Sequence, residues 1–199
     1  MKRLKFIQSI AAVIMGLPLL SFYIFSAKEK ECYTDPDVKE PFFRDGAPTR
    51  LDLAKGYEGA GDRLLVSGQV FGGDCSSPLK RAQIDIWHAS PKGEYDLSSN
   101  KFLFRGTLFT DKKGYYHYET LVPKGYKDGG LDRPKHIHYR ITANEHHTLV
   151  TQLYFTGDEK LKNDPFVRIN DGYRSVKTPQ KTAAGDYKMS FDISMRPKS

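Results

Sequence analysis

The sequence predicts an all-β fold, an antiparallel β-sandwich, preceded by an N-terminal segment that directs export. Three observations support this class. Short runs rich in β-branched and aromatic residues alternate with turn chemistry such as D-K-K-G at Asp111–Gly114. Helical periodicity is confined to one brief stretch near Asp158. The length of 199 residues, with 39% hydrophobic residues, suits one core with a segment attached.

Residues 1–27 form the predicted export segment. Lys2, Arg3 and Lys5 precede a largely apolar run that continues to Ala27, as in a secretory signal peptide. The run is also long enough to span a bilayer, so a cleaved signal and a retained N-terminal membrane anchor are both open. Because the basic residues stay on the cytoplasmic side of the membrane, either arrangement places the rest of the chain in the periplasm or outside the cell.

Residues 28–60 are expected to form an irregular, proline-containing arm. The chain has two cysteines, Cys32 in this arm and Cys75 in a glycine-rich loop. In an oxidising compartment a single pair allows one intramolecular connectivity, so the sequence predicts a disulfide that attaches the arm to the sheet. Two free thiols are the alternative.

Residues 61–199 are predicted to hold the sandwich. Seven runs have the composition and the alternation of strands, and turn residues separate them. A short helical turn is expected within Asp158–Ile169. The predicted strands are Leu64–Phe71, Ala82–His88, Phe102–Thr110, Tyr115–Thr120, His136–Ala143, Leu149–Phe155 and Tyr187–Met195.

The formal net charge of +7 bears on the partners of the chain. Lys2, Arg3 and Lys5 contribute three of these charges, so the excess on the remaining residues is modest. It favours an anionic substrate or a membrane surface. No basic block is interleaved with aromatic residues, and a nucleic-acid partner is therefore not expected.

His136 and His138 form an H-x-H pair at the start of a predicted strand. Residues i and i+2 of a strand point to the same face, so both imidazoles reach one place, as metal ligands do. Pro134 supports a strand that begins just after it. The alternative is a pair of histidines that face a polar cleft.

Two tyrosines in loops strengthen the metal interpretation. Tyr126 follows Gly125 in a loop dense in glycine and proline, and Tyr95 ends the turn-like segment P-K-G-E-Y. Two phenolates and two neutral imidazoles form an anionic, mostly hard ligand set. Such a set suits Fe(III) better than Zn(II) or Cu(I).

Five motifs follow one another between Ile84 and Asp158: IWHASPKGEY, FRGTLFTDKKGYYHYET, VPKGY, RPKHIHY and LVTQLYFTGD. In this order they resemble the core of the intradiol ring-cleavage dioxygenases, the family of catechol and protocatechuate dioxygenases. The resemblance implies one non-haem Fe(III) per chain, and it implies two active-site residues beside the metal, Arg133 and Gln152. The implied iron ligands are Tyr95, Tyr126, His136 and His138.

The resemblance also implies a reaction. The enzyme would use O2 to cleave a catechol-type ring between its two hydroxylated carbons and release a muconate-type dicarboxylic acid. Tyr126 would be the ligand that the substrate displaces. One departure concerns the substrate, since Ser90 stands where the family often has an acidic residue. We expect the segments Asp45–Glu58 and Asp96–Lys101 to line the substrate pocket.

Two other functions compete with this interpretation. A non-catalytic secreted β-sandwich binding module would have lost a ligand, whereas all four are present. A zinc or copper protein built on the H-x-H pair would need further His, Asp or Cys ligands. Which catechol is used and the oligomeric state are open in the sequence.

Several other residues have structural interpretations. Trp87 is expected in the core, because it closes a strand-like run with two isoleucines. His88 and His117 are expected to be structural or surface histidines. Arg105 is either a salt-bridge partner or part of the site.

Overall fold

The structure is a computed structural model that describes residues 32–37, 42–169 and 172–198. Residues Cys32–Ser199 form one compact unit. The predicted export segment, residues 1–27, lies outside the described residues. Within the described part of the chain, no helix is both long and apolar enough to cross a membrane.

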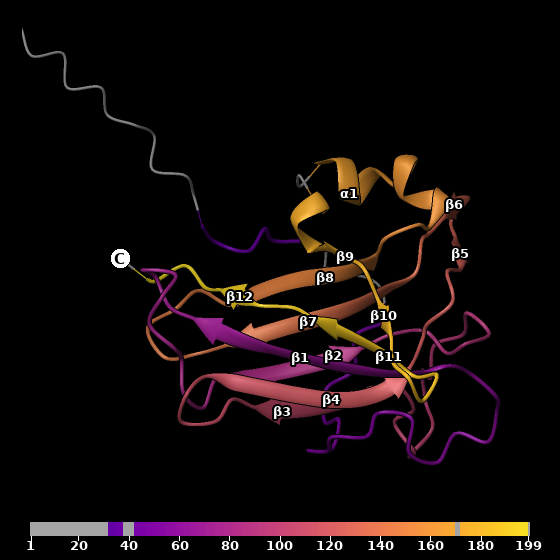
Figure 1. The fold of residues 1–199 in the computed structure, drawn as a ribbon, viewed down its shortest axis with the longest axis horizontal. Helices are drawn as coiled ribbons and strands as arrows, with labels where there is room; N and C mark the ends of the chain where they lie inside the picture. The colour runs from indigo at the N-terminus through magenta and orange to yellow at the C-terminus, as the bar shows by residue number, and fades with distance from the viewer. Residues whose placement is uncertain (1–31, 38–41, 170–171, 199) are drawn as a thin grey trace, which may run out of the picture. The chain divides into compact units, whose positions relative to one another are not determined.

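Two five-stranded sheets make up the molecule, together with a two-stranded ribbon (Figure 1). The first sheet is built on β1 (Arg63–Phe71), which pairs with β4 (Tyr115–Leu121), β11 (Tyr187–Ser190) and β12 (Ile193–Ser194), while β10 (Gln180–Lys181) pairs with β11. The second sheet runs in the order β3 (Arg105–Phe109), β2 (Gln83–Trp87), β7 (His136–Thr142), β8 (Leu149–Phe155) and β9 (Val176–Lys177).

The predicted sandwich is confirmed, and its sheets are mixed. Most neighbouring strands are antiparallel, but β1 pairs in parallel with β11 and β12, and β8 pairs in parallel with β9. The core lies between the sheets. It takes alternate residues from each strand, for example Leu64, Val66 and Val70 from β1 and Ile137, Tyr139 and Ile141 from β7.

Two of the predicted strands differ from the observed ones by more than one residue at an end. The predicted strand Phe102–Thr110 begins only at Arg105, because Phe102 and Phe104 have φ angles of 49° and 56°. The predicted strand Tyr187–Met195 is divided into β11 and β12. Between them, an oxygen of the Asp192 side chain accepts the backbone N–H of Gln69 at 2.9 Å, where a strand would offer a carbonyl.

The expected helical stretch contains η1 (Glu159–Lys162) and α1 (Pro165–Ile169), and η2 (Gly172–Ser175) follows. These turns lie beside β8 and β9 (Figure 1). The ribbon of β5 (Lys127–Asp128) and β6 (Leu131–Asp132) was not predicted, although its Gly129–Gly130 turn, with φ angles of 54° and 90°, is a hairpin signal.

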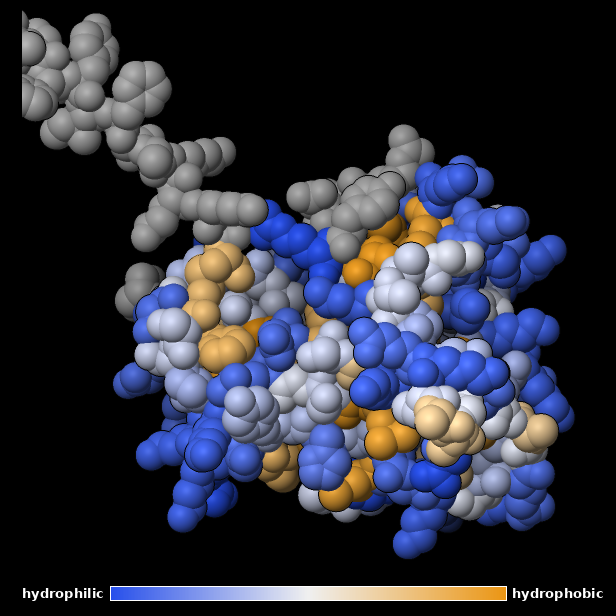
Figure 2. Space-filling model, viewed as in Figure 1, coloured by the Kyte–Doolittle hydropathy of each residue, from blue (hydrophilic) through white to orange (hydrophobic). Residues whose placement is uncertain are grey.

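The predicted disulfide is present in the structure. Cys32 and Cys75 are bonded, with 6.1 Å between their Cα atoms. The disulfide joins two positions that are 43 apart in the sequence. The arm also adds backbone hydrogen bonds to the sandwich, such as Thr34 N–H to Ser194 O at 3.0 Å, and buries Leu53 completely. On the face shown in Figure 2, hydrophilic side chains predominate and the apolar ones form separate small groups.

Candidate metal centre

The register of the second sheet places the histidine pair. In β7, Ile137, Tyr139 and Ile141 face the core, so His136 and His138 face the other side. The Nε2 atoms of the two histidines lie 3.1 Å apart, and both side chains are buried. The prediction that the H-x-H spacing brings both imidazoles to one place is confirmed.

The neighbouring strands support these rings. His138 lies between Trp87 of β2 and Gln152 of β8 in the register. The indole of Trp87 stacks on the imidazole of His138, with centroids 4.7 Å apart and an interplanar angle of 4°. Trp87 is buried as predicted, but it belongs to the wall of this site rather than to the core between the sheets.

Both histidines are held in the neutral form that binds metals. Burial lowers the pKa of His136 to about 3, and the charge of Arg133 adds to the effect. Burial likewise lowers the pKa of His138 well below its ordinary value. His136 Nδ1 donates to the carbonyl of Pro134 at 2.8 Å, which leaves the lone pair of Nε2 free toward His138.

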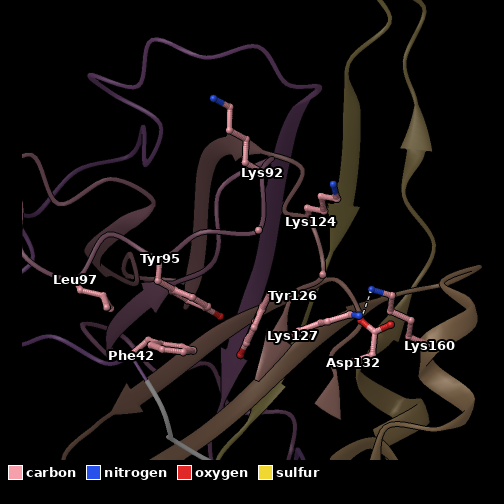
Figure 3. A pocket seen from close by; sticks show the side chains of 11 residues that line it. Phe42, Lys92, Tyr95, Leu97, Lys124, Tyr126, Lys127, Asp132 and Lys160 are labelled. Atoms are coloured by element: carbon pink, nitrogen blue, oxygen red, sulfur yellow. Dashed lines mark hydrogen bonds and ion pairs between the residues drawn. The ribbon is translucent and has the colours of Figure 1, made fainter. Parts of the chain in front are cut away.

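Tyr95 and Tyr126 bring two hydroxyl groups to the same place. The hydroxyl oxygen of Tyr95 lies 3.4 Å from Nε2 of His136. The rings of Tyr95 and Tyr126 meet edge to face at 5.2 Å, and their hydroxyl groups point toward one region (Figure 3). The hydroxyl of Tyr126 is buried and has no hydrogen-bond partner among the described residues.

Glycine makes this convergence of two loops possible. A Cβ on Gly125 would lie 2.4 Å from the carbonyl oxygen of Arg133, so only glycine fits there. The same close approach lets the N–H of Arg133 donate to the carbonyl of Tyr126 at 2.8 Å. Gly93, with φ of 87°, faces the Gly125 carbonyl from the loop that carries Tyr95.

The donor set fits a bound cation. Two ligand atoms that each lie about 2.1 Å from a metal, at about 90° to one another, are separated by about 3 Å, as the two Nε2 atoms are. Burial raises the pKa of Tyr126 and, together with the neighbouring Tyr126, raises the pKa of Tyr95 well above its ordinary value. A cation would lower both and so provide the partner that the Tyr126 hydroxyl lacks.

The other two predicted residues adjoin this centre. Arg133 donates from Nε to Asp164 at 2.6 Å and from Nη2 to Gln152 Oε1 at 3.0 Å. Burial by itself would lower the pKa of Arg133, but the carboxylate of Asp164 outweighs it and the pKa is raised. The hydroxyl of Tyr154 lies 3.1 Å from the same Gln152 oxygen, and it donates its single proton to the nearer carboxylate of Asp37 at 2.7 Å.

Sequence reasoning missed three residues of the site. Asp164 is completely buried and orients Arg133, while its other oxygen caps α1. The sequence signal was Asp164-Pro165, a helix start, but nothing in it indicated the ion pair. Tyr154 was placed in a strand without a role. Phe42 stacks on Tyr95 at 4.3 Å and meets Tyr126 edge-on at 5.7 Å.

Arg105, His88 and Ser90, three residues singled out in the sequence, lie in or near the site and have different surroundings. Arg105 is buried beside the site, with its guanidinium carbon 6.0 Å from the centre of the Tyr95 ring. His88 is a buried structural histidine that hydrogen-bonds Thr120 at 2.8 Å. Ser90 caps its own turn by accepting the N–H groups of Lys92 and Glu94.

A cavity of about 460 Å³ opens beside the two tyrosines. Of the two segments expected to line the substrate pocket, Asp96–Lys101 contributes Leu97 to this cavity and Asp45–Glu58 contributes none. A smaller cavity of about 200 Å³, which also reaches Tyr95, takes Tyr57 from the latter segment. The lining residues of the first cavity are Phe42, Lys92, Gly93, Tyr95, Leu97, Lys124, Gly125, Tyr126, Lys127, Asp132 and Lys160 (Figure 3).

Comparison with known proteins identifies the family. A family model described as Dioxygenase matches residues 38–197. The 6-chlorohydroxyquinol 1,2-dioxygenase of Cupriavidus pinatubonensis is 29% identical over 214 residues, which cover 98% of this chain and 75% of that protein. The chlorocatechol 1,2-dioxygenase of Rhodococcus opacus is 33% identical, over 66% of this chain and 60% of that protein.

Solved structures agree with these relatives. The dioxygenase domain of a dioxygenase and carbohydrate-binding fusion protein from Streptomyces sp. SirexAA-E superposes with a TM-score of 0.71 at 32% identity. It covers 83% of this chain and 99% of that one. The chain therefore belongs to the intradiol ring-cleavage dioxygenases, as its motifs predicted, and it is an aromatic ring-cleaving oxidoreductase.

Proposed function

We propose that this chain is an exported, Fe(III)-dependent intradiol dioxygenase that cleaves a catechol between its two hydroxylated carbons with O2. The product is a muconate-type dicarboxylic acid. The observation that carries the proposal is the convergence of two histidine Nε2 atoms and two tyrosine hydroxyls in one buried place. Among the described residues no group of three or more His, Cys, Asp or Glu side chains could hold a metal, and in the proposed set two tyrosines complete the two histidines.

The four converging residues are the proposed iron ligands. Two phenolates and two neutral imidazoles are hard donors whose charge suits Fe(III). Fe(III) held there supplies Lewis acidity, which favours loss of both phenolic protons from a catechol and its reaction with O2. The ligands are Tyr95, Tyr126, His136 and His138.

Tyr126 is the proposed proton acceptor. Its hydroxyl has no hydrogen-bond partner among the described residues, whereas that of Tyr95 lies against His136. The resemblance to the family implies that Tyr126 is the phenol that gives up its position to the substrate. On doing so it takes up a phenolic proton at its hydroxyl oxygen, which its raised pKa favours.

Arg133 and Gln152 are the proposed orienting residues. The guanidinium of Arg133 is held on one side by Asp164, and its Nη2 donates to Gln152, so its position is set before substrate binds. A fixed cation next to the ring stabilises negative charge that develops there. Gln152 in turn accepts the hydrogen bond from Arg133 and packs beside the hydroxyl of Tyr154. Trp87 and Phe42 cover the ligands and exclude water.

Export is a separate part of the proposal. Support for it comes from the basic and apolar residues 1–27 and from the pairing of both cysteines, which suits an oxidising compartment. Expression of the full chain followed by cell fractionation tests it. We expect the protein in the periplasm, the medium or the outer face of the membrane, and recovery from the cytoplasm would contradict export.

An iron assay with a visible spectrum tests the ligand set. Residues 28–199 should bind about one iron per chain and show the charge-transfer colour of tyrosinate bound to Fe(III), with a spectral shift when catechol is added. Tyr126→Phe should alter this colour, whereas Tyr115→Phe, at an exposed tyrosine of β4, should not. A protein that stays colourless after Fe(III) reconstitution would overturn the proposed function.

A further inference from the structure

The cavity beside Tyr95 and Tyr126 has a strongly positive lining. Four of its lining residues are lysines and one is an aspartate. Lys160 is paired with that aspartate, Asp132, at 2.6 Å. The remaining three, Lys92, Lys124 and Lys127, are exposed and form no ion pair with a described residue. We call these three the lysine rim.

The rim carries more positive charge than the acids beside it can balance: Lys127 lies opposite Asp132 in the β5–β6 ribbon, but that carboxylate is already paired with Lys160. Neighbouring acids in the sequence, Glu94 and Asp128, do not line the cavity. Three like charges around one opening repel one another, which costs folding free energy unless a ligand offsets it.

Deeper in the site, Arg133 is already paired with Asp164. In and around the site, positive charge without an acidic partner among the described residues therefore lies in two places, on the exposed lysines at the mouth and on the buried guanidinium of Arg105 beside Tyr95, and only the lysines line the cavity.

The positions of the lysines bear on where an anionic group of the substrate would lie. In Figure 3 the hydroxyl groups of Tyr95 and Tyr126 point toward one region, and the side chains of Lys92 and Lys124 extend away from it. In the same view Lys127 lies beside the pair of Lys160 and Asp132. The volume of about 460 Å³ is in the range of cavities that hold ligands larger than one benzene ring.

We infer that the substrate is a catechol that carries a carboxylate at the end of a short side chain, with the lysine rim binding that carboxylate. This inference rests on the proposed function, because the ring must be held at the metal centre. It goes beyond that function by specifying which substituent on the catechol ring the lysine rim binds. The lysines contribute attraction and orientation at the mouth, and screening by salt weakens both.

Matched substrates test the inference. We compare 3-(3,4-dihydroxyphenyl)propionate with its neutral amide, using oxygen uptake by the iron-loaded protein at low and high ionic strength. At low ionic strength kcat/KM should be about tenfold higher for the acid, and the ratio should shrink as salt is added. A ratio near one at low ionic strength would overturn the inference.

Two triple variants locate the effect. The rim variant combines three substitutions, Lys92→Gln, Lys124→Gln and Lys127→Gln. It should bring the ratio of kcat/KM for the acid to kcat/KM for the amide close to one. The control removes the same charge elsewhere, through Lys112→Gln, Lys113→Gln and Lys188→Gln, three exposed lysines outside the cavity lining. The control should keep the ratio of the unmodified protein. An equal loss of the ratio in both variants would indicate only net charge and would overturn the rim as the binding group.

A binding measurement separates this inference from the proposed function. Calorimetric titration with 3-(4-hydroxyphenyl)propionate, which is not a catechol, requires no turnover. Tighter binding to the control variant than to the rim variant supports the anion site, and equal binding overturns it. If no catechol is consumed while this difference persists, the proposed function fails and the anion site stands.

Discussion

The Nε2 atoms of His136 and His138 lie 3.1 Å apart on the face of β7 that points away from the core. Burial keeps both imidazoles neutral, with the pKa of His136 lowered to about 3. Two unprotonated rings at this distance are a prepared pair of metal ligands. The two tyrosines beside them differ, because burial raises the pKa of each phenol and so favours its protonated form before a metal binds.

Metal loading should therefore release protons from the tyrosines and none from the histidines. Near neutral pH we expect the tyrosines to release about two protons per Fe(III), from which the protons taken up by the freed citrate are subtracted, and metal affinity should rise with pH because the phenols must ionise. Calorimetry of Fe(III)–citrate loading in two buffers of different ionisation enthalpy measures the number. Tyr126→Phe should release one proton fewer. The same number from this variant and from the unmodified protein would contradict Tyr126 as a ligand.

The pair of Arg133 and Asp164 should be important for stability. Asp164→Asn keeps an oxygen to cap α1 but leaves the buried guanidinium without its counter-charge, so we expect a loss of roughly 3–5 kcal/mol in the free energy of unfolding. The control is Asp132→Asn at the exposed pair with Lys160, where about 1 kcal/mol or less is expected. Urea unfolding of both variants compares them, and equal losses would contradict the prediction.

His88 should make stability depend on pH. Burial lowers the pKa of His88 from 6.5 to about 4, so between these values the unfolded chain binds a proton that the folded chain does not. The contribution of neutral His88 to the free energy of unfolding is complete above about pH 6.5. It is lost as the pH falls from 6.5 through 4, by about 3 kcal/mol in total. His88→Gln should show a flatter dependence in urea unfolding at several pH values. Parallel curves for the two proteins would contradict this role.

The disulfide should stabilise the chain by restricting its unfolded state. Because Cys32 and Cys75 are 43 positions apart, the loop-closure entropy corresponds to about 4 kcal/mol. Replacing both cysteines by serine should lower the free energy of unfolding by about that amount, as should reduction of the unmodified protein. Urea unfolding measures both. A loss of less than about 1 kcal/mol in each case would show that the arm contributes little to unfolding.

The predicted strands and the H-x-H pair depended on local chain geometry. Alternation along β1 predicts which of its residues are buried, and the same period of two brings His136 and His138 together. The arm and loop contacts were not predictable in this way. Phe42 stacks on Tyr95 because two segments 53 positions apart happen to meet, and no pattern in either segment encodes that distance.

Sequence alone determined the fold class and the family and nominated the proposed metal ligands, because each of these depends on residue types in short, ordered motifs. Only the tertiary structure decided how these residues are used. It paired Arg133 with Asp164 across 31 positions, placed Trp87 on the ring of His138, and gathered lysines from three segments around one cavity. The physical reason is that backbone geometry sets directions between near neighbours, whereas sheet register and loop packing set the distances between segments far apart in the chain.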